Sequence, residues 1–289
     1  MFFQQVVNGL TVGSIYALVA LGYSMVYGVL QIVNWAHADV MMVGTFIGLT
    51  LVSVLHIPVI AMIVLAAAAT AVLGMGVERI AYRPIKVNRR MAVLVSALGM
   101  SVFLQNLAQL VWGSGSKPLQ IFTRKTFTAG TVTFTNLQII ITLITFLMLF
   151  ILYILVYKTK IGVAMRACST SIENAKLMGI NSNLIISATF GLGSFIAGIG
   201  GVLIGAYYNS VYPTMGYLLG MKAFAAAILG GIGSIPGAVI GGYLIGLIES
   251  LGAGYLSSNY RDAYSFIVMI VILGLRPSGI MGAKRVDKV

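Results

Sequence analysis

The chain is 289 residues long, 59% of them hydrophobic and 8% charged, with a formal net charge of +12 and a mean hydropathy of +1.01. Soluble domains carry about a quarter charged residues because their surfaces face water, so this composition excludes a soluble globule of this size. Charge inside a bilayer costs roughly 2.5 kcal/mol or more per residue, which explains the shortage. The chain is therefore predicted to be an integral membrane protein. Its Lys and Arg residues cluster in short links between apolar stretches, which argues against nucleic-acid binding.

The apolar stretches are too long for barrel strands, which alternate over about ten residues. Helices satisfy their own backbone hydrogen bonds in lipid, so the spans are predicted to be helical. We predict an all-α polytopic membrane protein with about 8 transmembrane helices, or up to 10 if broken stretches are counted separately. In chain order the stretches are 5–33, which is long enough to be tilted or broken, then 40–55, 59–77, 91–112, 137–157, a glycine-rich region over 184–254, and a last span over about 264–275.

Charged links set the predicted orientation of these spans. The links 78–90 and 158–183 and the C-terminal segment from Arg276 hold most of the 18 Lys and Arg residues. Basic residues near span ends favour the cytoplasmic side, so these segments and the C-terminus are predicted to be cytoplasmic. The N-terminus and a loop over 113–136 then lie outside. Within that loop, the β-branched run 126–135 predicts a short extended segment or hairpin. The whole chain, 1–289, is predicted to be one transmembrane domain.

A short helix is predicted inside the cytoplasmic link. The sequence Thr170-Ser171-Ile172-Glu173 fits a capping box, with Thr170 as the N-cap and Glu173 reaching back to its amide. Gly179 suits the left-handed position that ends a helix. Eight or nine residues are too few to cross a bilayer. Two interpretations stay open, a docking knob for another protein and a solvent-exposed connector.

A glycine- and proline-rich interruption divides the region 184–254. Such breaks at membrane depth are typical of discontinuous helices that line a translocation path, and a tight turn in a packed helical hairpin is an equally good interpretation. The spacings Gly237–Gly241 and Gly242–Gly246 also permit close helix contact. The candidate pathway or gate residues in this interruption are Gly231, Gly233 and Pro236.

Polar residues within the apolar regions form a second group of pathway or gate candidates. Asn34, His37 and Asp39 lie in one polar link, where His37 could titrate near neutral pH with Asp39 as its partner. Helix capping at a membrane edge is the simpler interpretation. Lys222 and Glu249 are charges on predicted spans, so each is a functional candidate. They could instead pair with each other or extend toward the interface.

Several kinds of chemistry are absent from the sequence. It contains no G-x-x-x-x-G-K-[ST] phosphate loop, no zinc-ligand spacing and no nucleophile elbow, and its carboxylates are few. We therefore predict that the chain is not an enzyme, has no catalytic or metal-binding residues and binds no cofactor. The single cysteine, Cys168, excludes an intrachain disulfide and is predicted to be a packing residue.

Six segments, in chain order, carry a likeness to known proteins. They are NGLTVGSIYALVALGYSMVYGVLQIVNWAHAD (8–39), VERIAYRPIK (77–86), SALGMSVFLQN (96–106), AMRACSTSIENAKLMGIN (164–181), MKAFAAAILGGIGSIPGAVIGG (221–242) and LRPSGIMG (275–282). With these segments the chain resembles the membrane permeases of ABC importers for branched-chain amino acids, and among them the first of the paired permeases of the high-affinity leucine/isoleucine/valine system. It departs from the family pattern N-F-A-H-G at Trp35 and Ala38, and it has Val163 where a basic residue is common.

The resemblance implies a bacterial cytoplasmic (inner) membrane location and a division of labour. Two ATPase subunits would use ATP, a periplasmic binding protein would deliver substrate, and a second permease, identical or different, would complete the pathway. The segment 164–181 would be the coupling helix that rests on an ATPase, which favours the docking interpretation. The coupling residues would be Arg166, Thr170, Glu173 and Gly179.

Three alternatives to this function stay open. A related permease could carry urea or short amides. An ion- or proton-coupled secondary transporter could use His37, Asp39, Lys222 or Glu249 as a relay. A channel would conduct through this chain alone.

Overall fold

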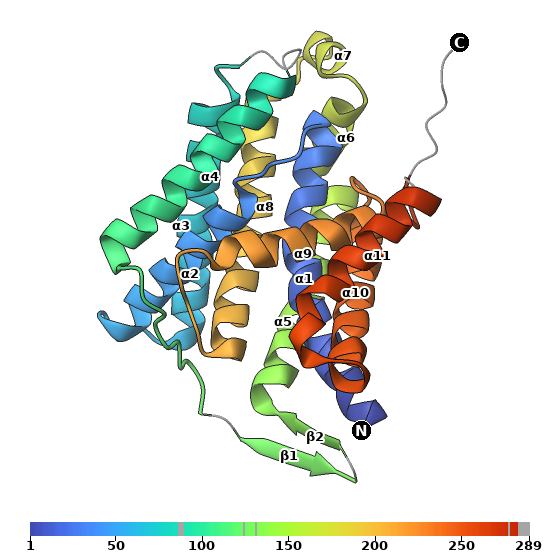
Figure 1. The fold of residues 1–289 in the computed structure, drawn as a ribbon. Coiled ribbons are helices and arrows are strands. Elements are labelled where there is room, and N and C mark those ends of the chain that lie inside the picture. The colour runs from blue at the N-terminus through green and yellow to red at the C-terminus, as the bar shows by residue number, and fades with distance from the viewer. Residues whose placement is uncertain (86–89, 124, 131, 277, 283–289) are drawn as a thin grey trace.

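The computed structural model describes residues 1–85, 90–123, 125–130, 132–276 and 278–282 (Figure 1). Within them, six helices are long and apolar enough to cross a membrane, and two shorter helices are apolar. They confirm the prediction of an all-α polytopic membrane protein, with six candidate spans where about eight were predicted. The six are α1 (Phe2–Leu30), α3 (Val59–Val77, continued by the π-helical turn Glu78–Tyr82), α4 (Arg90–Trp112), α5 (Asn136–Lys158), α8 (Ser182–Tyr208) and α10 (Ile235–Tyr255), and the shorter two are α2 (His37–Ser53) and α9 (Met215–Gly230).

Helix α11 (Arg261–Leu275) corresponds to the predicted last span, but it has only 15 residues. At 1.5 Å per residue it is about 22 Å long, which is less than the ~30 Å hydrocarbon core of a bilayer. It follows a single 3-10 turn (Ser258–Tyr260). Helix α9 is short for a different reason, because it runs across the long helices near the middle of the bundle (Figure 1).

Helix α1 is the central helix of the bundle and is continuous. Its polar residues near the N-terminal end suggested that it could be broken, and this expectation was wrong. The hydroxyls of Thr11 and Ser14 each donate to a carbonyl four residues earlier, on Val7 and Leu10, at 2.8 Å. Because the polar side chains are satisfied within the helix, they leave its backbone ladder intact.

Glycines allow α1, α9 and α10 to pack backbone against backbone. A Cβ atom on Gly246 would lie 2.4 Å from the amide nitrogen of Gly13 and from the carbonyl oxygen of Gly9. On the opposite face of α10, a Cβ on Gly237 would lie 2.3 Å from the carbonyl oxygen of Gly230, at the end of α9. Both predicted small-residue spacings therefore mediate close contact, one toward α1 and the other toward α9.

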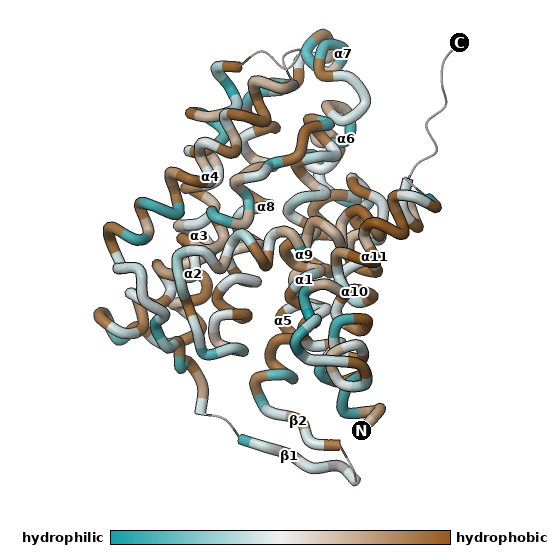
Figure 2. The backbone as a smooth tube through the Cα atoms, viewed as in Figure 1, coloured by the Kyte–Doolittle hydropathy of each residue, from teal (hydrophilic) through white to brown (hydrophobic). Residues whose placement is uncertain are grey.

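The surface of the bundle is apolar along its length. Figure 2 shows hydrophobic residues along α3, α4 and α5. Leu110, Leu143 and Phe150 are among the exposed apolar side chains on α4 and α5. Contiguous exposure of this kind in a helical bundle is a surface for lipid.

The two ends of the bundle differ in structure. One end carries α6 (Lys160–Thr170) and α7 (Ile172–Leu177), and the other carries the N-terminus and an antiparallel hairpin of β1 (Thr126–Ala129) and β2 (Val132–Thr135) (Figure 1). The hairpin pairs Thr126 with Thr135 and confirms the extended prediction for this loop.

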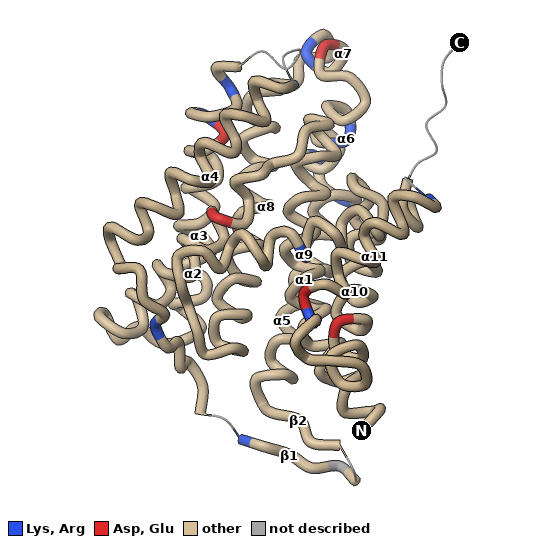
Figure 3. The backbone as a smooth tube through the Cα atoms, viewed as in Figure 1, with Lys and Arg blue, Asp and Glu red and all other residues tan. Residues whose placement is uncertain are grey.

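Charged residues follow the same division between the two ends. Basic residues gather at the α6 and α7 end, and few lie near the hairpin (Figure 3). The alternation of sides predicted from the charges is thus present, and which end faces the cytoplasm stays a prediction. The predicted basic residues Lys86, Arg89 and Arg124 and the tail 284–288 lie outside the described residues.

Candidate functional site

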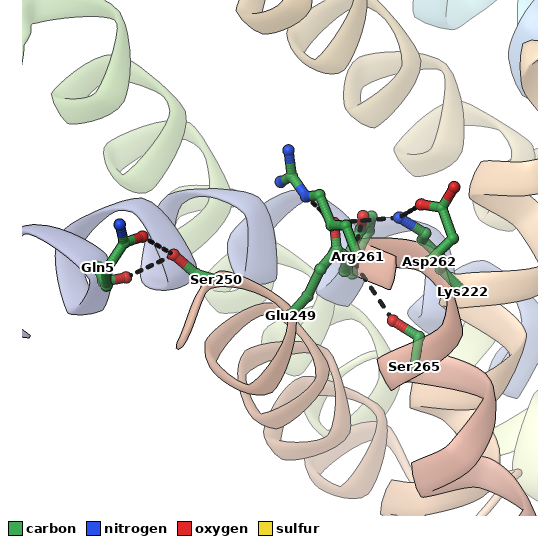
Figure 4. A network of polar contacts seen from close by, with 8 residues as sticks. Gln5, Lys222, Glu249, Ser250, Arg261, Asp262 and Ser265 are labelled. Atoms are coloured by element: carbon green, nitrogen blue, oxygen red, sulfur yellow. Dashed lines mark hydrogen bonds and ion pairs between the residues drawn. The ribbon is translucent and has the colours of Figure 1, made fainter. Parts of the chain in front are cut away.

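A cluster of four charged side chains joins three helices. Lys222 of α9 lies at its centre, with its Nζ 3.0 Å from Oε1 of Glu249 on α10 and 2.6 Å from Oδ1 of Asp262 on α11. Arg261, at the first position of α11, places its Nε 2.6 Å from the same Oε1 of Glu249. Figure 4 shows the four side chains converging from α9, α10 and α11. The cluster holds two positive and two negative charges.

The innermost charge of the cluster is fully satisfied by neighbours. The Glu249 side chain is buried, and its Oε2 accepts from the Tyr16 hydroxyl of α1 at 2.9 Å and from the Ser265 hydroxyl at 3.4 Å. Lys222 is buried as well. Of the two interpretations left open for Lys222 and Glu249, the structure shows the ion pair. A buried carboxylate keeps its charge only with such partners.

Sequence reasoning missed two members of this cluster. Neither Arg261 nor Asp262 was among the candidates that the sequence predicted. A usable signal was present, because Asp262 is an acidic residue in the first turn of a helix, directly after an Arg. Which distant charge such a pair contacts depends on how α9, α10 and α11 pack.

A cavity of about 230 Å³ lies beside the charged cluster. It is bounded on one side by charged groups and on the others by apolar and tyrosine side chains. Burial, with the nearby Asp262 carboxylate, raises the pKa of the Tyr212 phenol, so this hydroxyl stays neutral near pH 7. The lining residues are Ile204, Tyr208, Ser210, Tyr212, Met215, Leu218, Leu219, Lys222, Arg261 and Asp262.

His37 and Asp39 are both buried, but their side chains contact different partners. Asp39 accepts hydrogen bonds from the Ser101 hydroxyl and from Gln105 Nε2, the latter at 3.0 Å. The His37 ring packs edge-on against Tyr23, with 4.8 Å between ring centroids. No ion pair joins His37 to Asp39 within the described residues. Asp39 lies in the first turn of α2, where a negative charge favours the helix N-terminus.

Asn34 fixes the loop before α2. Its Oδ1 accepts from the Ala36 amide at 3.1 Å and from the Tyr82 hydroxyl at 2.7 Å. This link between α1 and α2 therefore matches the capping interpretation better than the proton relay. Among the described residues, no group of three or more His, Cys, Asp and Glu side chains could hold a metal ion.

The turn between α9 and α10 contains Gly231 and Gly233, and Pro236 follows at the start of α10. Gly231 and Gly233 have φ values of +101° and +92°, which favour glycine. Ser234 caps α10 by accepting from the Gly237 amide at 3.2 Å, and Pro236 occupies its first turn. This geometry supports the tight-turn interpretation.

The end of the described chain packs onto this turn. The amides of Ile280 and Met281 donate to the carbonyls of Leu229 and Gly230, both at 2.9 Å. A Cβ on Gly231 would lie 2.3 Å from the Gly282 amide nitrogen, so the two glycines are in direct contact. The resembling motifs at 221–242 and 275–282 are thus one structural unit.

The segment predicted to couple to an ATPase consists of two helices, and the N-cap of the second differs from the prediction. Ser171 caps α7 by accepting from the Asn174 amide at 3.2 Å. Thr170 is instead the last residue of α6, and its hydroxyl donates to the Arg166 carbonyl at 3.2 Å. The capping-box prediction was wrong by one residue, because Thr170 and Ser171 both carry a suitable hydroxyl. As a result α7 has 6 residues rather than eight or nine.

Gly179 ends this segment as predicted, with a φ of +79°. The amide of Gly179 donates to the carbonyl of Lys176 and that of Ile180 to the carbonyl of Ala175, both at 3.0 Å. This is the pattern of a helix that ends at a glycine in the left-handed conformation. Cys168 of α6 is buried, which confirms the packing prediction.

Arg166 holds α6 against the bundle instead of projecting from it. Its guanidinium donates to the Val156 carbonyl at the end of α5 and lies over the Tyr157 ring, 5.7 Å from the centroid. Arg166 also lines a small cavity of about 120 Å³ together with Gly28 of α1 and Gly233. The structure therefore brings one predicted coupling residue next to one predicted gate residue.

The tip of α7 exposes apolar side chains that sequence reasoning did not single out. Leu177 is 86% exposed and Met178 is 82% exposed, directly before Gly179. Glu173 is exposed on the same helix, whereas Ala175 is buried against the rest of the segment. An apolar pair at a charged end of the molecule is unfavourable in water and is typical of a protein contact.

Comparisons with known proteins agree over the whole chain. The family described as branched-chain amino acid transport system / permease component matches residues 5–273. The high-affinity branched-chain amino acid transport system permease protein BraD of Pseudomonas aeruginosa is 42% identical, covering 100% of this chain and 98% of BraD. The corresponding permease protein LivH of Escherichia coli K12 is 40% identical with the same coverage.

More distant similarity extends to an archaeal protein and to a solved structure. A probable branched-chain amino acid transport permease protein LivH of Methanocaldococcus jannaschii is 31% identical over 93% of this chain and 89% of its own length. A chain of PsaBC from Streptococcus pneumoniae, solved with a Fab, has a TM-score of 0.50 over 96% of this chain and 93% of that chain. At 14% identity it shows a similar fold alone. Together with the full-length relatives, these matches show that the chain belongs to the family of permease components of branched-chain amino acid transport systems.

Proposed function

We propose that this chain is the transmembrane permease subunit of an ATP-driven importer for branched-chain amino acids. The observation that carries the proposal is the full-length identity of 42% and 40% to two permease proteins of high-affinity branched-chain amino acid transport systems. The polytopic helical bundle agrees with this function. Its proposed location is the bacterial cytoplasmic membrane, with the C-terminus in the cytoplasm.

The proposed assembly contains several partners. The sequence has no phosphate loop, so two partner ATPase subunits would bind and hydrolyse ATP. A second permease, identical or different, would complete the pathway, and a periplasmic binding protein would deliver the amino acid. This chain itself would bind no cofactor and catalyse no reaction.

The α6–α7 segment is the proposed contact with an ATPase. Leu177 and Met178 form an exposed apolar tip, and Gly179 fixes the turn that follows it. Arg166 connects α6 to α5 and lines the same small cavity as Gly233 of the α9–α10 turn. A displacement of the tip on ATP binding would thereby reach α1 and the α9–α10 turn, which supports an alternating-access cycle.

Uptake into vesicles tests the energy source and the substrate together. The complete transporter, reconstituted with its binding protein outside and ATP enclosed, should accumulate radiolabelled leucine, and a proton gradient without ATP should drive no uptake. Excess isoleucine should compete with leucine, and excess urea should not. Uptake driven by the gradient alone would establish an ion-coupled transporter, and uptake of urea in place of leucine would establish an amide permease. Single-channel currents from this chain alone would establish a channel.

A further inference from the structure

The charged cluster separates into an inner pair and an outer pair. The side chains of the inner pair, Lys222 and Glu249, are 4% and 0% exposed. Those of the outer pair, Arg261 and Asp262, are 34% and 50% exposed. Lys222 Nζ contacts Glu249 Oε1 directly, so the two inner charges pair with each other. The outer pair is therefore not required to neutralise the buried charges.

Arg261 and Asp262 each have hydrogen-bonding atoms that the cluster does not use. Arg261 uses its Nε for Glu249, and its guanidinium carbon lies 5.5 Å from the centroid of the Tyr208 ring. Its two terminal nitrogens have no hydrogen-bond partner among the described residues. Asp262 uses Oδ1 for Lys222, and its Oδ2 has none there either. In Figure 4 the terminal nitrogens of Arg261 and the second oxygen of Asp262 point away from the inner pair.

Arg261 and Asp262 both line the cavity of about 230 Å³. Four apolar side chains line it as well, namely Ile204, Met215, Leu218 and Leu219. Pockets for drug-sized ligands occupy about 300–1,000 Å³, so this one has the scale of a smaller molecule. The cavity thus combines a donor of positive charge, an acceptor of negative charge and an apolar wall.

We propose that this cavity binds one zwitterionic amino acid with an aliphatic side chain. The terminal nitrogens of Arg261 donate to the α-carboxylate, in the forked geometry that suits guanidinium and carboxylate groups. The free oxygen of Asp262 accepts from the α-ammonium group, and the apolar wall contacts the aliphatic side chain. This inference rests on the proposed function and names the residues at which the permease holds its substrate.

The charge arrangement favours a zwitterion over simpler ligands. Opposite charges on adjacent residues match a molecule whose own opposite charges are one carbon apart. A lone cation would meet the Arg261 guanidinium, a lone anion would meet the Asp262 carboxylate, and either contact is repulsive. Urea offers no aliphatic group for Ile204, Met215 and the two leucines. The cavity also lies at the end of α8 and the start of α11, which the charge distribution predicts to be the outer side.

Protection from labelling tests binding at the cavity without the binding protein. Tyr212, a half-buried lining residue, is replaced by cysteine in a Cys168→Ala background within the assembled transporter. The rate of maleimide labelling is then measured with leucine, with isocaproate, which lacks the ammonium group, and with isoamylamine, which lacks the carboxylate. Thr128→Cys on the exposed hairpin is the control, because no ligand should protect it.

Leucine should slow labelling of the Tyr212 variant, and the two analogues should protect only at much higher concentration. Adding Arg261→Gln or Asp262→Asn should raise the leucine concentration for half protection about tenfold or more, the size of a lost charge-assisted hydrogen bond. Asp262→Glu should retain most of the protection, because it keeps the carboxylate. Thermal unfolding of each variant separates a loss of binding from a loss of folding.

Equal protection by all three ligands would overturn the proposal, as would unchanged half protection in both charge variants. ATP-driven leucine uptake without any protection by leucine would overturn this inference and leave the proposed function standing. Failure of the wild-type transporter to accumulate leucine would instead contradict the proposed function.

Discussion

Lys222 of α9 forms ion pairs with residues of α10 and α11. Burying its charged ammonium group costs free energy. An ammonium group in a low-dielectric interior loses hydration worth several kcal/mol, which only close partners recover. Glu249 and Asp262 provide them at 3.0 and 2.6 Å. Glu249 in turn receives Arg261 and the Tyr16 hydroxyl. The ion pairs join α9, α10 and α11, and the Tyr16 hydrogen bond joins this cluster to α1.

Replacing Lys222 by methionine should destabilise the permease, because Glu249 then keeps only Arg261 as a cationic partner. Breaking a buried pair costs roughly 3–5 kcal/mol, and the retained Arg261 places this variant at the lower end. The double variant Lys222→Met/Glu249→Gln should recover at least half of the loss, since no unpaired buried charge remains. Thermal unfolding of the purified assembly measures both. Additive losses in the double variant would show that the two residues are not coupled.

At the scale of elements, the contact between α1 and α10 depends on glycines, which have no side chain to keep the two helices apart. Gly13 and Gly246 let the backbones of α1 and α10 approach closely. Such contact matters in lipid, because helices there are held together by van der Waals packing and not by the exclusion of water. Gly76 of α3 offers a comparison, because a Cβ there would meet nothing within 4 Å. The same substitution is therefore expected to have opposite effects at two helical glycines.

Gly246→Ala should lower stability by about 1–3 kcal/mol, because its methyl group would overlap backbone atoms of Gly9 and Gly13 and push α1 from α10. Gly76→Ala should be neutral or stabilising by roughly 0.5–1 kcal/mol, since alanine favours a helix more than glycine does. Comparing the thermal unfolding midpoints of the two variants checks this. Equal destabilisation by both would mean that the α1–α10 contact does not depend on the glycine.

The α7 tip is the element whose exposed apolar surface should matter for coupling and not for folding. The double variant Leu177→Ser/Met178→Ser should reduce ATP-dependent leucine uptake about tenfold, because the apolar contact proposed with the ATPase is lost while both residues are already exposed to solvent. Unfolding temperature should stay unchanged. Ile161→Ser, at a 49% exposed apolar position of α6, is the matched control and should transport normally. Normal uptake by the double variant would contradict the coupling role of the tip.

At the scale of the molecule, the sequence predicted what depends on neighbours along the chain. Span lengths follow from apolar runs, and the hairpin over 126–135 follows from its β-branched residues. The partner of Lys222 on α11 could not be predicted, because it depends on how separate helices pack. The N-cap at Ser171 was missed for a local reason, since the adjacent Thr170 offers the same hydroxyl. The transverse path of α9 has no signature in its composition.

The orientation of the whole bundle in the membrane stays a prediction. Labelling of introduced cysteines can test it, because the single native cysteine, Cys168, is buried. Cys168 is 1% exposed, so the wild-type chain should react little with a membrane-impermeant maleimide. Thr128→Cys, on the hairpin, should label in intact spheroplasts, because the excess of basic residues at the α6–α7 end predicts that the hairpin lies outside. Lys160→Cys, exposed at the start of α6, should label only after permeabilisation. The reverse pattern would invert the topology and place the α7 tip out of reach of any cytoplasmic ATPase.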